Sequence, residues 1–362
     1  MVFLSKDNLA MKSVKHLGRT WQKDGIVWLG LSGTGIEFIF HGKRLETMVW
    51  GDSLIKDTDE KALRHRARIA VEINGKRTQC FCMTEPKKHL ILWDSAEETT
   101  VRVKIIKISE AAMSLVGIGP LKCEKEGIIE PTKEKAFRIE VIGDSITCGY
   151  GIDDPHAEHS FQTQTEDATK AYAYLAAQKL DADYSLVSYS GYGVLSGYTE
   201  ENAANVRETL PQYYEKVAHS DGKLPDGTRL DDILWDFDRF KADVVVINLG
   251  TNDDSFCQDQ VDRQLQYAEL YTKFIKKVRT LNPIAEILCI YGLMGDRLYP
   301  FVEKAVEQYK EKTKDAHIHC ADIQPHSDSD GYSADGHPSI ISQKRLAEEL
   351  FKKICKITNK KG

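Results

Sequence analysis

The stretch Ala242-Asp-Val-Val-Val-Ile-Asn-Leu249, continued by Gly250-Thr-Asn-Asp253, decides the fold of the second half of this chain. Its near-continuous apolar run is typical of a β-strand that is buried on both faces. Such strands occur in parallel sheets whose two faces are covered by helices. The polar residues that follow the run stand where a parallel sheet presents its functional groups.

Further strands and helices alternate around this run. We expect strands over 137–142, 184–188, 285–291 and 317–323, and helices over 167–180, 260–281, 301–314 and 340–357. Strands that alternate with helices predict a parallel, doubly wound sheet. The predicted fold of this half is therefore α/β, with a flavodoxin-like five-stranded parallel sheet.

The first third of the chain has a different texture. Its apolar residues come in short β-rich runs, such as Ile36-Glu-Phe-Ile-Phe and Ala67-Arg-Ile-Ala-Val-Glu-Ile, and Asn74-Gly75 is a hairpin signal. Several strands without long helices indicate a β-sandwich. We therefore predict a β-domain over residues 1–125, a charged linker over 126–136 and an α/β domain over 137–362.

Composition excludes several classes of protein. The formal net charge is −6, so no basic field is available to attract nucleic acid. No apolar run reaches the roughly 18 residues of a membrane span, and a charge at Lys6 interrupts the start before a signal peptide could form. We therefore expect a cytoplasmic protein without nucleic-acid or membrane partners. The eight cysteines are scattered along the sequence, and we expect them to be free thiols. Oligomeric state stays open.

Chemistry-bearing residues follow the predicted strands. Ser145 comes after the first strand, Gly191 after the second, Asn252 after the third, and the pair Asp335 and His337 after the fifth. The carboxyl ends of parallel strands meet at one edge of a sheet, where ligands bind. We therefore expect these side chains to gather at one site.

This set meets the needs of acyl transfer. Ser145 would attack as the nucleophile, His337 would act as base and then as acid, and Asp335 would orient the imidazole. The backbone N–H groups of Ser145 and Gly191, with the side-chain amide of Asn252, would form the oxyanion hole. The mechanism needs neither cofactor nor metal, and the histidine and cysteine spacings do not predict a metal site.

The motifs resemble the SGNH hydrolases of the GDSL esterase group. The four blocks of that family are recognised by Ser, Gly, Asn and His, which match Ser145, Gly191, Asn252 and His337. The stretch Gly143-Asp-Ser-Ile-Thr-Cys-Gly-Tyr-Gly151, together with the β-domain before it, resembles carbohydrate esterase family 2 more narrowly. This resemblance implies a jelly-roll domain joined to an SGNH domain that removes acetyl groups from xylan or glucomannan.

Two departures from the family pattern concern the base. The aspartate stands two residues before the histidine, whereas it usually stands three before it in the broader GDSL group. Some members of family 2 are thought to orient the histidine with a backbone carbonyl, so the role of Asp335 stays open between these two arrangements. Gly336 takes a position that is often aromatic in the family, which removes one sugar-facing side chain.

The residues therefore predict a serine esterase, and the resemblance implies the acetylxylan esterase type, acting on acetylated plant oligo- or polysaccharides. Trp235, in a loop-rich stretch, is a candidate for stacking on a sugar ring. One alternative is a short-chain acyl esterase or thioesterase on non-sugar substrates. A second alternative is a carbohydrate-binding protein without catalysis.

Overall fold

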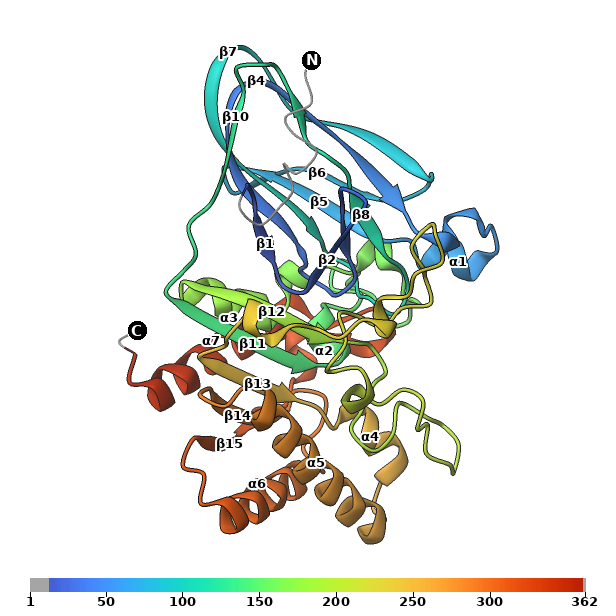
Figure 1. The fold of residues 1–362 in the computed structure, drawn as a ribbon. Helices are drawn as coiled ribbons and strands as arrows, with labels where there is room; N and C mark the ends of the chain where they lie inside the picture. The colour runs from blue at the N-terminus through green and yellow to red at the C-terminus, as the bar shows by residue number, and fades with distance from the viewer. Residues whose placement is uncertain (1–12, 361–362) are drawn as a thin grey trace. The chain divides into compact units, whose positions relative to one another are not determined.

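The computed structural model describes residues 13–360, which form two compact units (Figure 1). The β-rich unit comprises the described residues up to Glu134 together with 162–166 and 216–235. The α/β unit comprises residues 135–161, 167–215 and those from 236 onward. Two short segments from the second half of the sequence thus belong to the β-rich unit.

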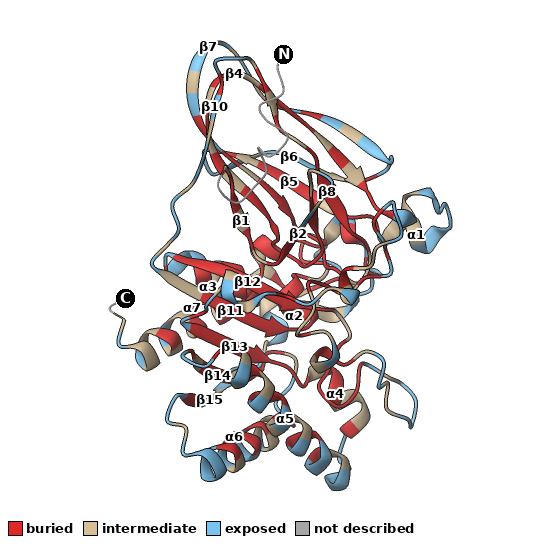
Figure 2. Cartoon of the chain, viewed as in Figure 1, coloured by how far each residue is buried: buried red, intermediate tan, exposed pale blue. Residues whose placement is uncertain are grey.

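The α/β unit is built on a five-stranded parallel sheet with the strand order β12-β11-β13-β14-β15. In order of the chain this is 2-1-3-4-5, the flavodoxin-like order, and the predicted fold class is confirmed. The strands β11, β12, β13 and β14 are buried almost throughout, as the red ribbons of Figure 2 show. Their bounds are Phe137–Gly143 for β11, Ala182–Ser188 for β12, Val244–Asn248 for β13, Glu286–Gly292 for β14 and Ile318–Ile323 for β15.

Helices cover the sheet as two packed pairs, α3 with α7 and α5 with α6 (Figure 1). Two short helices, α2 and α4, follow β11 and β13 directly. Helix α3 begins at Tyr172, later than the sequence predicts, because Asp167 caps a separate 3-10 turn through the N–H of Thr169. The bounds are Ser145–Cys148 for α2, Tyr172–Lys179 for α3, Thr251–Cys257 for α4, Val261–Leu281 for α5, Tyr299–Thr313 for α6 and Ile340–Thr358 for α7.

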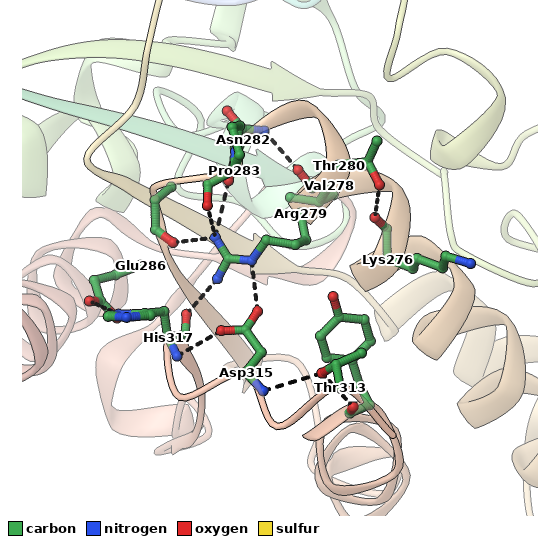
Figure 3. Close-up of polar contacts among 12 residues, drawn as sticks. Lys276, Val278, Arg279, Thr280, Asn282, Pro283, Glu286, Thr313, Asp315 and His317 are labelled. Carbon is green, nitrogen blue, oxygen red and sulfur yellow. Dashed lines mark hydrogen bonds and ion pairs between the residues drawn. The ribbon is translucent and has the colours of Figure 1, made fainter. Parts of the chain in front are cut away.

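One half-buried guanidinium fixes the edge of the sheet that lies opposite the strand carboxyl ends (Figure 3). Arg279, in the last turn of α5, donates to the backbone carbonyls of Ala285 at 2.6 Å and His317 at 3.0 Å. Its Nε donates to Asp315 at 2.8 Å. The end of α5 is thereby tied to the residues that lead into β14 and β15, which keeps these strands in register.

The β-rich unit is an antiparallel sheet system around one apolar core. Its two longest strands, β4 (Gly35–Gly51) and β7 (Lys87–Lys107), pair along most of their length. The predicted hairpin at Asn74-Gly75 is confirmed, since both residues have positive φ (51° and 78°) between β5 and β6. The remaining bounds are Lys15–Leu17 for β1, Thr20–Lys23 for β2, Ile26–Leu29 for β3, Arg68–Ile73 for β5, Lys76–Cys82 for β6, Val116–Ile118 for β8, Lys122–Cys123 for β9 and Glu60–Arg64 for helix α1.

The predicted linker 126–136 contains a strand. Residues Ile128–Pro131 form β10, which pairs antiparallel with β4. Ile129 packs against the core of the β-rich unit, whereas Ile128 is exposed. The charges that suggested a linker lie on either side of this short strand, within which Glu130 is exposed.

Two sequence-based expectations concern the chain as a whole. All eight cysteines, which lie within the described residues, are free thiols, as expected. Among residues 13–360, no helix is both long and apolar enough to cross a membrane.

Candidate active site

The candidate nucleophile stands at the turn between β11 and α2. The Asp144 carboxylate accepts the N–H of Ile146 at 3.0 Å and caps the short helix that Ser145 begins. A side chain at Gly143 would lie 2.0 Å from the Thr147 hydroxyl oxygen, so only glycine fits this turn. Ser145 is 4% exposed, and the turn directs its hydroxyl toward a histidine.

That histidine is His337, whose Nε2 lies 2.9 Å from Oγ of Ser145. Burial lowers the pKa of His337 to about 4, although the backbone carbonyl of Asp335, its carboxylate charge and the carbonyl of Ala334 act in the opposite direction. At neutral pH the imidazole is therefore uncharged and able to accept the hydroxyl proton. The predicted pair of Ser145 and His337 meets in the structure at hydrogen-bond distance.

The carboxylate of Asp335 does not reach the imidazole. Its Oδ2 accepts the hydroxyl of Tyr150 at 2.8 Å and the N–H of Phe161 at 2.9 Å. Nδ1 of His337 has no hydrogen-bond partner of ordinary geometry within residues 13–360. The expectation of a carboxylate bonded to the imidazole is thus not met, because Asp335 has a left-handed backbone (φ 51°) that turns its side chain toward Tyr150.

An aromatic stack holds the ring of His337, and the sequence analysis missed it. Tyr150 stacks on His337 with 4.0 Å between ring centroids and 23° between planes. On its other face Tyr150 stacks on Phe161, again at 4.0 Å. The hydroxyl of Tyr150 also bonds Asp335, so one side chain contacts both the imidazole and the turn before it. The signal was present in Gly149-Tyr150-Gly151, directly after the nucleophile turn.

The predicted oxyanion donors face the same cavity as Ser145 and His337. Gly191 has a φ of 82°, a backbone conformation that favours glycine. Asn252 is 7% exposed and uses one N–H of its amide to donate to the carbonyl of Tyr192 at 2.9 Å. The amide has a second N–H, so it can still serve as a donor to an oxyanion.

A buried carboxylate anchors the loop that carries Gly191. Asp253, which follows Asn252 in α4, accepts the N–H groups of Val194, Leu195 and Ser196 at 2.9, 2.6 and 3.0 Å. Burial raises the pKa of Asp253 to about 6, and the three N–H donors act against that rise. The loop and α4, which carry two of the predicted oxyanion donors, are thereby held together.

The cavity has a volume of about 890 Å³. Besides the predicted site residues, Tyr198 and polar side chains from α4 and the segment after it line the cavity. Its charged groups include Asp335, Asp254 and Asp259, with Arg297 at 3.6 Å from an oxygen of each of the last two. The lining residues are Ser145, Tyr150, Ser190, Gly191, Tyr198, Thr251, Asn252, Asp254, Ser255, Gln258, Asp259, Met294, Arg297, Asp335 and His337.

Trp235 is not part of this cavity. It belongs to the β-rich unit, is 6% exposed, and lies under the guanidinium of Arg19 at 5.6 Å from the ring centroid. The structure thus places Trp235 outside the cavity as a buried side chain, away from where stacking on a bound sugar would be expected. The sequence could not distinguish a buried anchor from an exposed platform in a loop-rich stretch.

Two family models match the chain. The GDSL-like Lipase/Acylhydrolase model matches residues 139–350, which include every residue that lines the cavity. The model of the N-terminal domain of carbohydrate esterase 2 matches residues 16–132. The two matches follow the order of domains that the sequence analysis expected.

The chain is similar to two named bacterial proteins. The cellulase/esterase CelE of Acetivibrio thermocellus is 29% identical over 285 residues, covering 77% of this chain and 31% of that protein. The chain therefore corresponds to about a third of CelE. An acetylxylan esterase/glucomannan deacetylase of Cellvibrio japonicus is 28% identical over 346 residues, covering 95% of this chain and 88% of that protein.

Solved structures share the fold. The acetyl xylan esterase Est2A of Butyrivibrio proteoclasticus superposes with a TM-score of 0.86 at 24% identity, covering 99% of this chain and 100% of that one. A family two carbohydrate esterase from Clostridium thermocellum, solved in complex with cellohexaose, gives a TM-score of 0.81 at 24% identity, covering 96% and 99%. At this identity the likeness is one of fold.

Proposed function

We propose, since the chain belongs to the GDSL-like lipase/acylhydrolase family, that it is a serine esterase that removes O-acetyl groups from plant-type oligo- or polysaccharides. The observation that carries the proposal is the 2.9 Å contact between Oγ of Ser145 and Nε2 of His337, beside a polar cavity. This contact is the geometry that activates a hydroxyl for attack on an ester carbonyl.

The proposed reaction has two steps. His337 takes the proton of Ser145 as Oγ attacks the acetyl carbonyl, and then gives that proton to the departing sugar hydroxyl. Water then attacks the acetyl-enzyme with His337 again as base, which releases acetate and restores the serine. The N–H groups of Ser145 and Gly191 and the amide of Asn252 stabilise the tetrahedral oxyanion in both steps, each donor contributing about 3 to 4 kcal/mol.

We assign the orienting role at Nδ1 to the backbone carbonyl of Asp335 instead of its carboxylate. The carbonyl of Asp335 stabilises the protonated ring, and its carboxylate is engaged by Tyr150 and Phe161. A Ser–His pair with a backbone acceptor would complete the mechanism, and Tyr150 would keep the imidazole in its plane.

The lining of the cavity supports a small acyl group on a neutral sugar. Its carboxylates and amide groups, such as Asp254, Asp259 and Gln258, suit hydroxyl groups, and Met294 is the one aliphatic side chain among the lining residues. A long acyl chain would leave these polar groups without hydrogen-bond partners, which is costly. Relatives named as acetylxylan esterase/glucomannan deacetylase support the same substrate class.

The decisive experiment compares substrates and a nucleophile variant. Acetate release from acetylated xylan and glucomannan, and hydrolysis of p-nitrophenyl acetate and octanoate, are measured with the wild type and with Ser145→Ala. The proposal expects acetate release that Ser145→Ala abolishes, with acetyl esters preferred over octanoyl esters. Faster octanoate turnover would favour the acyl esterase alternative, and sugar binding without any hydrolysis would favour the binding-protein alternative. Cytoplasmic location stays a prediction, which assays of separated cytoplasm and medium would test.

A further inference from the structure

A tight turn on the α/β unit brings two imidazoles and a carboxylate together, outside the cavity. The N–H of His159 donates to the carbonyl of His156 at 3.1 Å, which closes the turn. The rings of His156 and His159 consequently lie 4.6 Å apart, and Glu158 stands between them in sequence. Ligand atoms of His156, Glu158 and His159 all lie within 4.8 Å of one another.

One of these imidazoles already has a carboxylate partner. The Asp154 carboxylate accepts Nδ1–H of His159, with N···O distances of 3.0 and 3.1 Å. Asp154 is 17% exposed at its side chain, whereas His159 is 53% exposed. A carboxylate on Nδ1 fixes the tautomer and leaves the lone pair of Nε2 free, which is the usual support of a metal-bound histidine.

We propose that His156, Glu158 and His159 bind a divalent transition-metal ion such as Zn²⁺, with Asp154 as the supporting carboxylate. Imidazole nitrogen and carboxylate oxygen are ordinary zinc ligands, and water can complete the coordination. The three side chains are exposed, so they can close by the small amount that a common ion requires.

The turn over residues 156–159 is hydrogen-bonded to the segment that precedes His337. The N–H of Asp335 donates to the carbonyl of His159 at 2.9 Å, and the N–H of Gly336 donates to the carbonyl of Ala157 at 3.1 Å. An ion that joins His156 to His159 would therefore brace the residues directly before His337. This consequence for catalysis rests on the proposed function, but the metal site and the bracing do not.

A second group of the same residue types offers a matched control. Glu286 on β14 gives one carboxylate oxygen to Nδ1 of His317 and the other to Nε2 of His319, each at 2.7 Å. Figure 3 shows His317 against Glu286. Here each imidazole is held by its own oxygen, so the group presents no common point for an ion.

Metal binding is tested by titrating the full chain with Zn²⁺ in a calorimeter under reducing conditions. The wild type and the control variant His317→Ala should each bind one more equivalent of Zn²⁺ than His156→Ala or His159→Ala does. Asp154→Asn should weaken that equivalent about 10- to 100-fold, as the loss of a supporting carboxylate does. The same isotherm in the wild type, His156→Ala and His159→Ala would overturn the proposal, as would loss of the equivalent in His317→Ala.

Bracing is tested by amide hydrogen exchange, which does not depend on esterase activity. Saturating Zn²⁺ should slow exchange of the amides of Asp335 and Gly336 in the wild type and in His317→Ala, and leave them unchanged in His156→Ala. If Zn²⁺ binds at the turn without slowing these two amides, the bracing is refuted. If Zn²⁺ binds at the turn and slows exchange of these two amides while the chain hydrolyses no ester, the esterase proposal is refuted and the metal-site proposal stands.

Discussion

The substitution Asp335→Asn separates the two ways of orienting His337. In a triad where a carboxylate holds the imidazole, replacing it by an amide lowers kcat about 10⁴-fold, or about 5.4 kcal/mol. In this structure the carboxylate instead accepts from Tyr150 and Phe161, at 2.8 and 2.9 Å. The two arrangements therefore differ in their expected outcome by orders of magnitude.

The contacts of Asp335 predict that Asp335→Asn lowers activity only slightly. Asn tolerates the left-handed backbone of Asp335 (φ 51°) almost as well as Asp does, so the turn before His337 should persist. Its amide oxygen can still accept from Tyr150 and Phe161, and only the charge assistance of these bonds is lost, about 1 kcal/mol. We expect kcat/KM to fall by less than about tenfold.

The assay measures kcat and KM on p-nitrophenyl acetate, with thermal unfolding as a check of folding. The companion Asp335→Ala removes both acceptor contacts and places a side chain with no polar group in a left-handed conformation, at about 1 to 2 kcal/mol. It should cost more activity than Asp335→Asn, together with a lower Tm. A fall near 10⁴-fold in a fully folded Asp335→Asn enzyme would refute the backbone-carbonyl assignment.

Three further outcomes follow from the site. The pKa of His337 is lowered to about 4, and the reactive form of its imidazole is the neutral one. A pH–rate profile should therefore show kcat/KM rising with pH through about 4 and reaching about 90% of its maximum at pH 5. An inflection near 6.5 would contradict this. Tyr150→Phe keeps the aromatic stack and should lower kcat less than about tenfold. Tyr150→Leu removes the aromatic contacts, worth about 0.5 to 1.5 kcal/mol each, and should lower kcat more. Equal kcat in the two variants would show that the stack does not contribute to catalysis. Asn252→Ala should lower kcat on p-nitrophenyl acetate about 10²- to 10³-fold with little change in KM. It should also lower Tm, because the Tyr192 carbonyl loses its hydrogen-bond donor. An unchanged kcat would show that Asn252 is not an oxyanion donor.

The features that the sequence predicted well are those that depend on local pattern. The buried run over Val244–Asn248 and its neighbouring strands alternate with helices, and this alternation predicted the parallel, doubly wound sheet that the structure has. Once the strands are parallel, their carboxyl ends share an edge, so Ser145 and His337 were expected at one site. The 2.9 Å distance between Oγ of Ser145 and Nε2 of His337 comes from the structure.

The features that the sequence missed depend on contacts between distant segments. Trp235 lies in the second half of the chain but packs within the β-rich unit, and nothing in its neighbouring residues indicates that partner. Ile128–Pro131 has the charged flanks of a linker, yet it pairs with a strand about ninety residues earlier in the chain. In both cases the deciding interaction is tertiary, so local pattern alone assigned the wrong environment.

The orienter of His337 is a different case, since a local signal was present. Asp-Gly is a pair that favours positive φ at both positions, and Asp335 and Gly336 have φ of 51° and 68°. Two left-handed residues in succession reverse the chain, so the carboxylate of Asp335 points toward Tyr150 while its carbonyl is left beside the ring that follows. An aspartate three residues before the histidine would be free of this turn. The spacing of two, combined with glycine between, thus argues for a carbonyl orienter on conformational grounds, before any distance is measured.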